Sequence, residues 1–90
     1  MDRPTVRAAD ALGWALFKNG RLAEARKRST EALRLGSRDP VLLYHAGVIA
    51  AAAGDKTGAI HDLRTALTLD GGFSPTGAKA ARDLLASLGG

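Results

Sequence analysis

The chain has 90 residues, with thirteen Lys and Arg against nine Asp and Glu, a net charge of +4 and no cysteine. A chain of this length forms one domain that buries only about 60 to 65% of its unfolded surface, so its margin of stability is small. The lack of cysteine excludes a disulfide framework, a thiolate metal site and a cysteine nucleophile. No apolar run reaches the roughly 18 residues of a membrane span, and no signal peptide is evident. We therefore expect a soluble protein, with the cytoplasm as its default compartment.

The first part of the sequence predicts a pair of helices. The first helix begins at Thr5 or Pro4 and runs to Lys18, where Asn19-Gly20 suits a left-handed C-terminal turn. The second helix covers 21–35 and ends at a glycine.

The next part predicts a second pair of helices. The third helix spans 40–53, with Asp39 at the N-cap and Pro40 at the first helical position. Asp55 then caps a fourth helix, which ends at Leu69. At each of these helix starts, an aspartate side chain can accept a hydrogen bond from a backbone N–H of the first turn.

A fifth helix is predicted over 75–88, with Ser74 before Pro75 repeating the arrangement of a cap followed by proline. Its apolar residues gather on one side, so we expect a terminal capping helix that presents a polar outer surface to water. No stretch has the alternating pattern of a strand, and the predicted fold class is therefore all-α.

The two helix pairs share a skeleton of small and aliphatic residues at a constant offset of 34 positions. The matching pairs are Gly13 with Gly47, Gly20 with Gly54, Ala25 with Ala59, Ala32 with Ala66, Leu33 with Leu67, and Leu35 with Leu69. Glycine inside a helix costs roughly 1 kcal/mol relative to alanine. Two such glycines at equivalent positions therefore indicate that each first helix closely approaches the second helix of an antiparallel hairpin.

A sequence period of this length, built of two helices, resembles the tetratricopeptide repeat. The chain matches the small positions of that motif. At the Leu-Gly position it has Leu12-Gly13, Ala46-Gly47 and Ala80-Ala81, and at the Ala position it has Ala25 and Ala59. The large positions depart from it, with Ala9 and Leu43 at the Trp position, Leu16 and Ala50 at the Tyr position, and Ser29 and Leu63 at the Phe position.

The resemblance implies a right-handed α-solenoid of antiparallel helix hairpins, with about two and a half units and five helices. In this reading residues 1–90 form one domain, in which repeat one covers about 6–39, repeat two about 40–73, and the C-terminal capping helix about 74–88. We expect the chain to be the C-terminal portion of a longer array of such repeats.

The first helix of each pair is apolar on two faces. At about 100° per residue, the first helix places Ala9, Leu12 and Leu16 on one side and Asp10, Trp14 and Phe17 on the other. One face would serve the hairpin. The other would meet a neighbouring repeat, a ligand or another copy of the chain.

In tetratricopeptide arrays the first helices line a concave groove, so the resemblance implies a set of partner-binding candidates: Arg7, Asp10, Trp14, Phe17, Lys18, Val41, Tyr44, Val48 and Arg82. Most of them are apolar or aromatic, and the Lys, Asn and Arg clamp that some family members use for a terminal carboxylate is missing. Large aromatic side chains carry much of the energy at protein interfaces. The leading hypothesis is a non-catalytic scaffold that binds a protein or peptide segment in this groove.

Two other functions compete with this hypothesis. The second is a structural or self-association role, in which Trp14, Phe17 and Tyr44 are buried by neighbouring repeats or by a second copy. The third is nucleic-acid binding through the basic segment 21–38, with affinity that falls steeply with salt. It is the weakest of the three, because the spacing predicts pairing of Glu24 with Arg28 and of Lys27 with Glu31.

No residue pattern supports catalysis or a bound cofactor. His45 and His61 belong to different predicted helices, and neither has a second His or a carboxylate three or four residues away, as a metal-binding helix face requires. We interpret both as surface histidines. The sequence therefore predicts no enzymatic activity, no metal and no cofactor.

Overall fold

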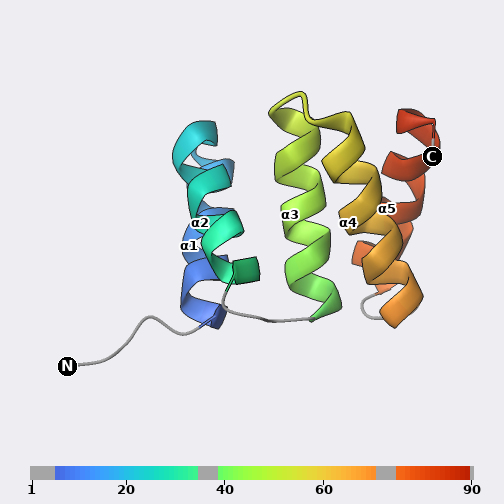
Figure 1. Cartoon of the computed structure of the whole chain (residues 1–90), viewed down its shortest axis with the longest axis horizontal. Helices are drawn as coiled ribbons and strands as arrows, with labels where there is room; N and C mark the ends of the chain where they lie inside the picture. The colour runs from blue at the N-terminus through green and yellow to red at the C-terminus, as the bar shows by residue number, and fades with distance from the viewer. Residues whose placement is uncertain (1–5, 35–38, 71–74, 90) are drawn as a thin grey trace.

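The computed structural model describes residues 6–34, 39–70 and 75–89 of the chain. Within these ranges the chain forms five α-helices and no strand (Figure 1), which confirms the all-α class. The helices are α1 (Val6–Lys18), α2 (Leu22–Arg34), α3 (Pro40–Ala52), α4 (Lys56–Leu69) and α5 (Pro75–Leu88). None of them combines the length and the hydropathy that crossing a bilayer requires.

The helix starts follow the predicted capping residues. The Asp39 carboxylate accepts a hydrogen bond from the Val41 N–H at 2.8 Å, ahead of a proline at the first helical position. The Asp55 carboxylate accepts one from the Gly58 N–H at 3.0 Å, which caps α4. The predicted cap at Ser74 lies outside the described residues. Helix α2 begins one residue later, and α3 ends one residue earlier, than the sequence predicts.

Successive helices run in opposite directions (Figure 1), and α1 packs along α2 as α3 packs along α4. The turns that close these two hairpins have the same geometry, because Gly20 and Gly54 adopt φ values of 77° and 86°. In each turn the glycine N–H donates three residues back and the next N–H donates five residues back, a pattern typical of helix C-termini. These bonds are 2.9–3.1 Å long and join Gly20 to Phe17, Arg21 to Leu16, Gly54 to Ala51 and Asp55 to Ala50.

The mid-helix glycines let the two helices of each hairpin approach closely, as the sequence predicts. A Cβ atom added to Gly13 would lie 3.3 Å from the Ala25 carbonyl oxygen on α2. A Cβ atom added to Gly47 would lie 2.7 Å from Cγ of Leu63 on α4, closer than carbon atoms can pack. The second hairpin is therefore the tighter of the two at this position.

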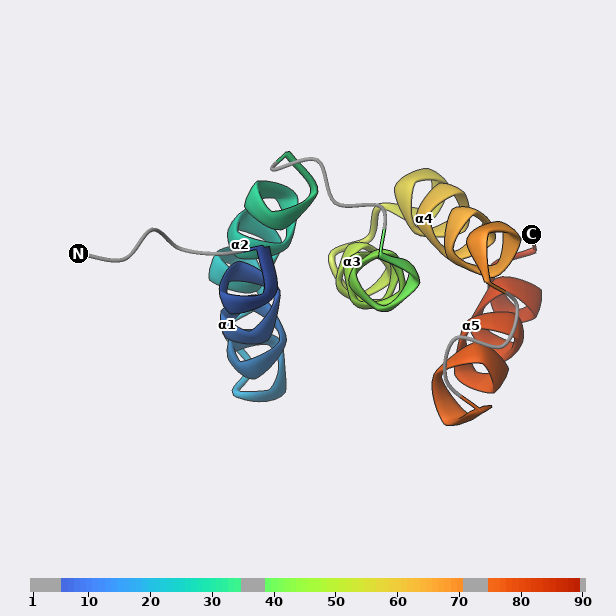
Figure 2. The same cartoon turned by 90° about the horizontal axis from the view of Figure 1, so that it is seen from below.

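The core consists of two clusters along a molecule that measures 42 × 25 × 20 Å. Ala9, Ala32 and Leu42 pack where α1, α2 and α3 meet, and Leu63, Ala81 and Leu85 pack in the second half of the chain. Helix α3 contacts the four other helices. Seen from below in Figure 2, α1 and α5 lie below α3, at opposite ends of the molecule, whereas α2 and α4 lie above it.

The side of α1 that holds Ala9 and Leu12 is only partly buried. Ala9 is 4% exposed, but Leu12 is 46% exposed. Helix α1 turns Gly13 toward α2, while the adjacent Leu12 lies on a more exposed side of the helix. The sequence left open which side of α1 is covered, and the structure buries Ala9 on this side but leaves Leu12 exposed.

Candidate functional site

Four rings from α1 and α3 gather into what we call the aromatic cluster: Trp14, Phe17, Tyr44 and His45. The Trp14 ring stacks on the His45 imidazole, with centroids 4.1 Å apart and planes inclined by 18°. The Phe17 ring stacks 5.2 Å from that of Trp14, and Tyr44 lies 6.1 Å from Trp14 in a tilted arrangement. All four side chains are half-buried, so the cluster retains a surface that a partner can contact.

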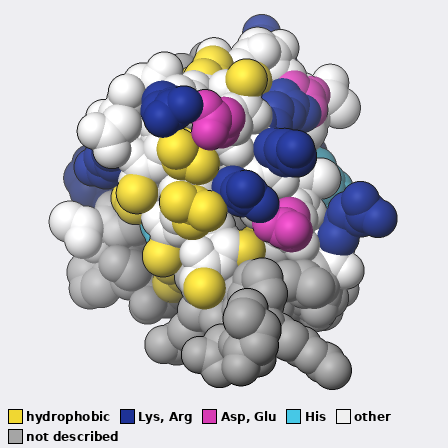
Figure 3. Space-filling view, turned by 90° about the vertical axis from the view of Figure 1, so that its left-hand side faces the viewer, with side chains coloured by type: hydrophobic (Ala, Val, Ile, Leu, Met, Phe, Trp, Pro, Cys, Tyr) yellow, Lys and Arg dark blue, Asp and Glu magenta, His cyan; other side chains and the backbone are white. Residues whose placement is uncertain are grey.

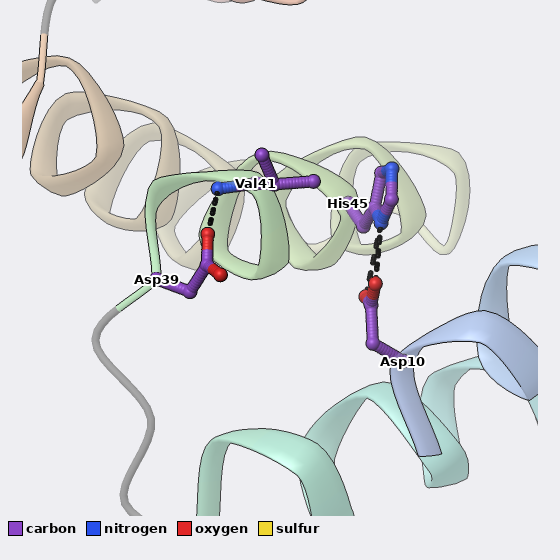
Figure 4. A network of polar contacts seen from close by, with 4 residues as sticks. All are labelled: Asp10, Asp39, Val41 and His45. Atoms are coloured by element: carbon purple, nitrogen blue, oxygen red, sulfur yellow. Dashed lines mark hydrogen bonds and ion pairs between the residues drawn. The ribbon is translucent and has the colours of Figure 1, made fainter. Parts of the chain in front are cut away.

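A polar contact fixes the His45 ring within this cluster (Figure 4). Nδ1 of His45 lies 2.9 and 3.0 Å from the two carboxylate oxygens of Asp10, and it donates to them when it carries the proton. The side chains of His45 and Asp10 are only 16% and 12% exposed. The pair joins α3 to α1 and thereby orients the imidazole for stacking on Trp14.

The interpretation of His45 as a surface histidine is therefore wrong. That interpretation considered only partners three or four residues away on the same helix, whereas Asp10 is on another hairpin. A usable signal was present in α1, because Asp10 is the only acid in this helix and lies on the face that holds Trp14 and Phe17. A carboxylate that becomes buried needs a hydrogen-bonding or charged partner, and this requirement points to a nearby donor.

Lys18 and Tyr44 extend the contacts of the aromatic cluster in two directions. The Lys18 ammonium lies 5.5 Å from the Trp14 ring centroid, within the range of a cation–π interaction, and its side chain is exposed. Tyr44 packs against the cluster of Leu63, Ala81 and Leu85. Through Tyr44, the rings on α1 and α3 are thus continuous with the core that holds α5.

The structure brings together five of the nine predicted partner-binding residues. Asp10, Trp14, Phe17, Lys18 and Tyr44 all take part in the contacts described above. The other four are not among the residues that define the cluster: Val41 and Val48 are half-buried on α3, Arg82 is exposed on α5, and Arg7 lies on α1 with a side chain outside the described part.

Much of the positive charge of α2 and of Arg21, which precedes it, is engaged in ion pairs. Arg21 pairs with Glu24 at 2.6 Å and Arg28 pairs with Glu31 at 3.2 Å. Arg26 reaches across to Asp55, at 2.5 Å, and so links α2 to the turn before α4. The predicted pairing of Glu24 with Arg28 and of Lys27 with Glu31 is wrong, because Arg21 and Arg28 each reach an acid three residues further along the chain.

Two carboxylates near the junction of α2, α3 and α4 have displaced pKa values. The hydrogen bond from the Gly58 N–H, followed by that from the Arg26 guanidinium, lowers the pKa of Asp55. Burial raises the pKa of Asp62, which lines a small cavity of about 50 Å³ between the three helices. Within the described residues, no three His, Asp or Glu side chains come close enough together to hold a metal ion.

Comparison with known proteins gives no match: no family model, no curated protein and no solved structure is significantly similar to this chain. The tetratricopeptide resemblance therefore stays a prediction that depends on the matching residues and on their constant spacing.

Proposed function

We propose that the chain is a right-handed α-solenoid of the tetratricopeptide type, a non-catalytic scaffold that binds a protein or peptide segment along the concave side of α1, α3 and α5. The repeated turn supports the architecture. Gly20 and Gly54 are equivalent under the offset that relates the two helix pairs, and the hydrogen bonds around them are equivalent too. The arrangement in Figure 2, with α2 and α4 on one side of α3 and α1 and α5 on the other, is compatible with such a groove.

The half-buried aromatic cluster is the observation that carries the binding proposal. A large ring that stays partly exposed loses more solvent-accessible apolar area on binding than any other side chain. Trp14 and Tyr44 are also held in place by His45, so little conformational entropy is lost when a partner contacts them. The partner that fits is an amphipathic segment with an apolar anchor, because the charge of Asp10 is already engaged with His45.

A structural role for the same rings is the second candidate, and a specific observation favours it. Trp14 stacks within the chain on His45, and Tyr44 packs against the core cluster that holds α5. The first contact joins the two hairpins and the second ties α3 to α4 and α5, whether or not a partner binds. In this alternative the cluster stabilises the stacking of hairpins, or the packing of another copy, and recognises no foreign segment.

Nucleic-acid binding through α2 stays the weakest alternative. Arg21, just before α2, and two arginines of α2 form ion pairs with Glu24, Glu31 and Asp55. Each pair reduces the positive charge available for phosphate contacts, which supply most of the non-specific affinity for nucleic acids.

The proposal is tested by affinity capture from the source organism's lysate, with mass spectrometry to identify the proteins retained. Three forms are compared: the natural chain, the double variant Trp14→Ala with Tyr44→Ala, and the control Leu69→Ala, which truncates an exposed leucine on α4. Circular dichroism must show that all three are folded. Groove binding predicts a set of proteins retained by the natural chain and the control but lost from the double variant.

The same experiment separates the two main candidates. If the double variant melts at a much lower temperature and all three forms retain the same proteins, the rings serve as a joint between hairpins. The binding proposal would then be wrong.

A further inference from the structure

A change in the charge of His45 acts directly on the contact between the two hairpins. Nδ1 of His45, on α3, lies 2.9 and 3.0 Å from the two carboxylate oxygens of Asp10, on α1 (Figure 4). The imidazole ring also stacks on Trp14, so both contacts run from the second hairpin to the first. Because histidine gains or loses its charge between about pH 5 and 8, this position can couple the packing of the hairpins to protonation.

The Asp10 carboxylate favours a positive charge on His45. Its side chain is only 12% exposed, so water compensates little of its charge. Among the side chains that the structure describes, no lysine or arginine pairs with Asp10. A neutral imidazole offers this carboxylate one N–H group, whereas the imidazolium offers the same N–H group and a full positive charge. On the face in Figure 3, by contrast, Lys and Arg side chains lie beside Asp and Glu at the surface, where such pairs contribute little.

The Trp14 ring acts in the same direction. Its plane is inclined by only 18° to that of His45, so the face of the indole meets the imidazole. The face of an aromatic ring is negative and attracts a cation within about 6 Å, an attraction that the neutral imidazole lacks. Lys18 also approaches this ring, at 5.5 Å, but its side chain is exposed, so solvent screens its repulsion of the imidazolium.

The other helices that pack on α3 bring no competing charge to His45. Its remaining ring contact is with the tilted ring of Tyr44 on its own helix. Within the described residues, no ionisable side chain of α2, α4 or α5 forms a hydrogen bond or ion pair with it. The remaining charged side chains of these three helices are exposed, apart from those with other partners or positions: Arg26 pairs with Asp55, Arg28 with Glu31 and Lys79 with Asp83, and Asp62 lines the small cavity beside Ala46.

We propose that the Asp10–His45 pair is a pH-sensitive contact, which holds α3 against α1 more firmly when the imidazole is protonated than when it is neutral. The proton comes from solvent and binds Nε2, which forms no hydrogen bond with a described residue, while Nδ1 keeps its contacts with Asp10. The added stabilisation is therefore greatest in mild acid and declines as the pH rises and the imidazole loses this proton. The contact belongs to the free chain, so it does not depend on whether the aromatic cluster binds a partner.

Thermal melts between about pH 5 and 8 test the proposal on the natural chain, His45→Gln and the matched control His61→Gln. The control removes the chain's other histidine, which is exposed on α4. The melting temperature of the natural chain should exceed that of His45→Gln most at the acid end, and this difference should shrink as the pH rises. His61→Gln should follow the natural chain. A difference between the natural chain and His45→Gln that does not change with pH would overturn the proposal.

Asp10→Asn tests the role of the carboxylate charge without changing the size of the side chain. The amide oxygen can still accept a hydrogen bond from Nδ1 of His45, but it has no negative charge to attract the imidazolium. The difference in melting temperature between the natural chain and Asp10→Asn should therefore shrink with rising pH, as it does for His45→Gln. A difference that is the same at every pH would contradict a contact that depends on charge.

The fluorescence of Trp14 gives a second readout that needs no variant of the pair. The chain has one tryptophan, and His45 and His61 are its two histidines. A protonated imidazole in contact with an indole ring quenches its fluorescence more strongly than a neutral one. Emission should therefore fall between about pH 8 and 5 in both the natural chain and His61→Gln. Constant emission in the natural chain, or a fall that His61→Gln abolishes, would overturn the proposal.

Discussion

The hairpin α1–α2 and the hairpin α3–α4 close with equivalent turns but have different interiors. Gly20 and Gly54 share a left-handed conformation and the same pair of hydrogen bonds. Inside the hairpins, the position that holds Ser29 in α2 holds Leu63 in α4, and Leu63 is completely buried. The backbone conformation that the two hairpins share thus depends on a few small residues. The packing inside each hairpin depends on the large residues placed between them.

The first helices of the two hairpins also differ in what covers them. The side of α3 that holds Ala46 and Ile49 lies under α2, whereas the matching side of α1, with Leu12 and Ala15, is exposed. A helical hairpin of this design therefore has a surface that folding within the hairpin does not bury. The contacts of α2 with α3 support both hairpins, but among the described residues no helix covers the outer side of α1.

The largest difference in stability between the two hairpins is expected when the core residue of α4 is truncated. Leu63→Ala should lower the free energy of unfolding by about 2–5 kcal/mol, because it removes buried methyl groups and leaves a cavity. Ser29→Ala, the equivalent change in α2, should cost less than about 1 kcal/mol, since it removes a single hydroxyl. Urea denaturation followed by circular dichroism measures both. Similar costs at the two sites would show that the second hairpin does not have the better-packed interior.

Replacement of the mid-helix glycines by alanine should also destabilise the protein more in the second hairpin than in the first. In Gly47→Ala the new methyl group would meet Leu63, which is buried and has no room to move, and overpacking of this kind costs about 1–3 kcal/mol. In Gly13→Ala the contacts are at 3.3 Å, so a small shift suffices, and the gain in helix propensity of about 1 kcal/mol offsets it. Thermal melts should show a clear loss for Gly47→Ala and little change for Gly13→Ala. A larger loss at Gly13 would contradict the tighter packing of α3 on α4.

A smaller effect is expected at the helix starts. Asp55 caps α4 by accepting from the Gly58 N–H, but its equivalent before α2 is Arg21, which has no acceptor to offer. Arg21→Asp should therefore stabilise the protein by about 0.5–1 kcal/mol, with Glu24 placed three residues later as in a capping box. Asp55→Ala should destabilise it. Differential scanning calorimetry measures both, and a loss of stability in Arg21→Asp would show that the two turns are not equivalent.

The direction of the pKa shift of Asp55 determines how its contribution to stability depends on pH. Its pKa is lower in the folded protein, so its stabilising effect is present above the unfolded pKa and is lost as the pH falls through the folded value. The difference in melting temperature between the natural chain and Asp55→Asn should accordingly narrow in acid. A difference that stays constant down to the lowest pH would contradict a charge-dependent cap.

The smallest effect is expected at Asp62, whose equivalent in α2 is Arg28. Burial raises the pKa of Asp62, so the folded state is most stable while this carboxyl is protonated and loses stability as the pH rises through the folded pKa. Asp62→Asn should therefore raise the melting temperature slightly at neutral pH and have no effect in acid. A variant that is less stable at neutral pH would show that the charged carboxylate has a favourable partner.

The sequence was sufficient for the local features of the fold. Asp39, Asp55 and the glycines at the turns act through their own backbone and a few neighbouring residues, so their identity predicts the adjoining helix boundaries to within one residue. The constant offset between the two helix pairs likewise predicted which glycines face the partner helix. Such features depend on interactions over one or two helical turns, which the order of residues displays directly.

The features that depend on contacts between helices were predicted less well. The aromatic residues Trp14, Phe17 and Tyr44 were recognised as candidates, but the pairing of His45 with Asp10 was not, because 35 residues separate them. The exposure of Leu12 was left open for a similar reason. Helical periodicity shows that a helix has two apolar faces, but it does not specify which of them another element covers.

The central claim is that a segment binds at the aromatic cluster, and the most direct test follows amide chemical shifts in NMR spectra of the isotope-labelled chain. A synthetic peptide from a captured protein is added to saturation. The account predicts that the largest shifts occur on α1 and α3 around Trp14, Tyr44 and His45, and that the Trp14 indole N–H is among them. Shifts confined to the outer side of α2, around Lys27 and Thr30, or no shifts at all, would contradict it.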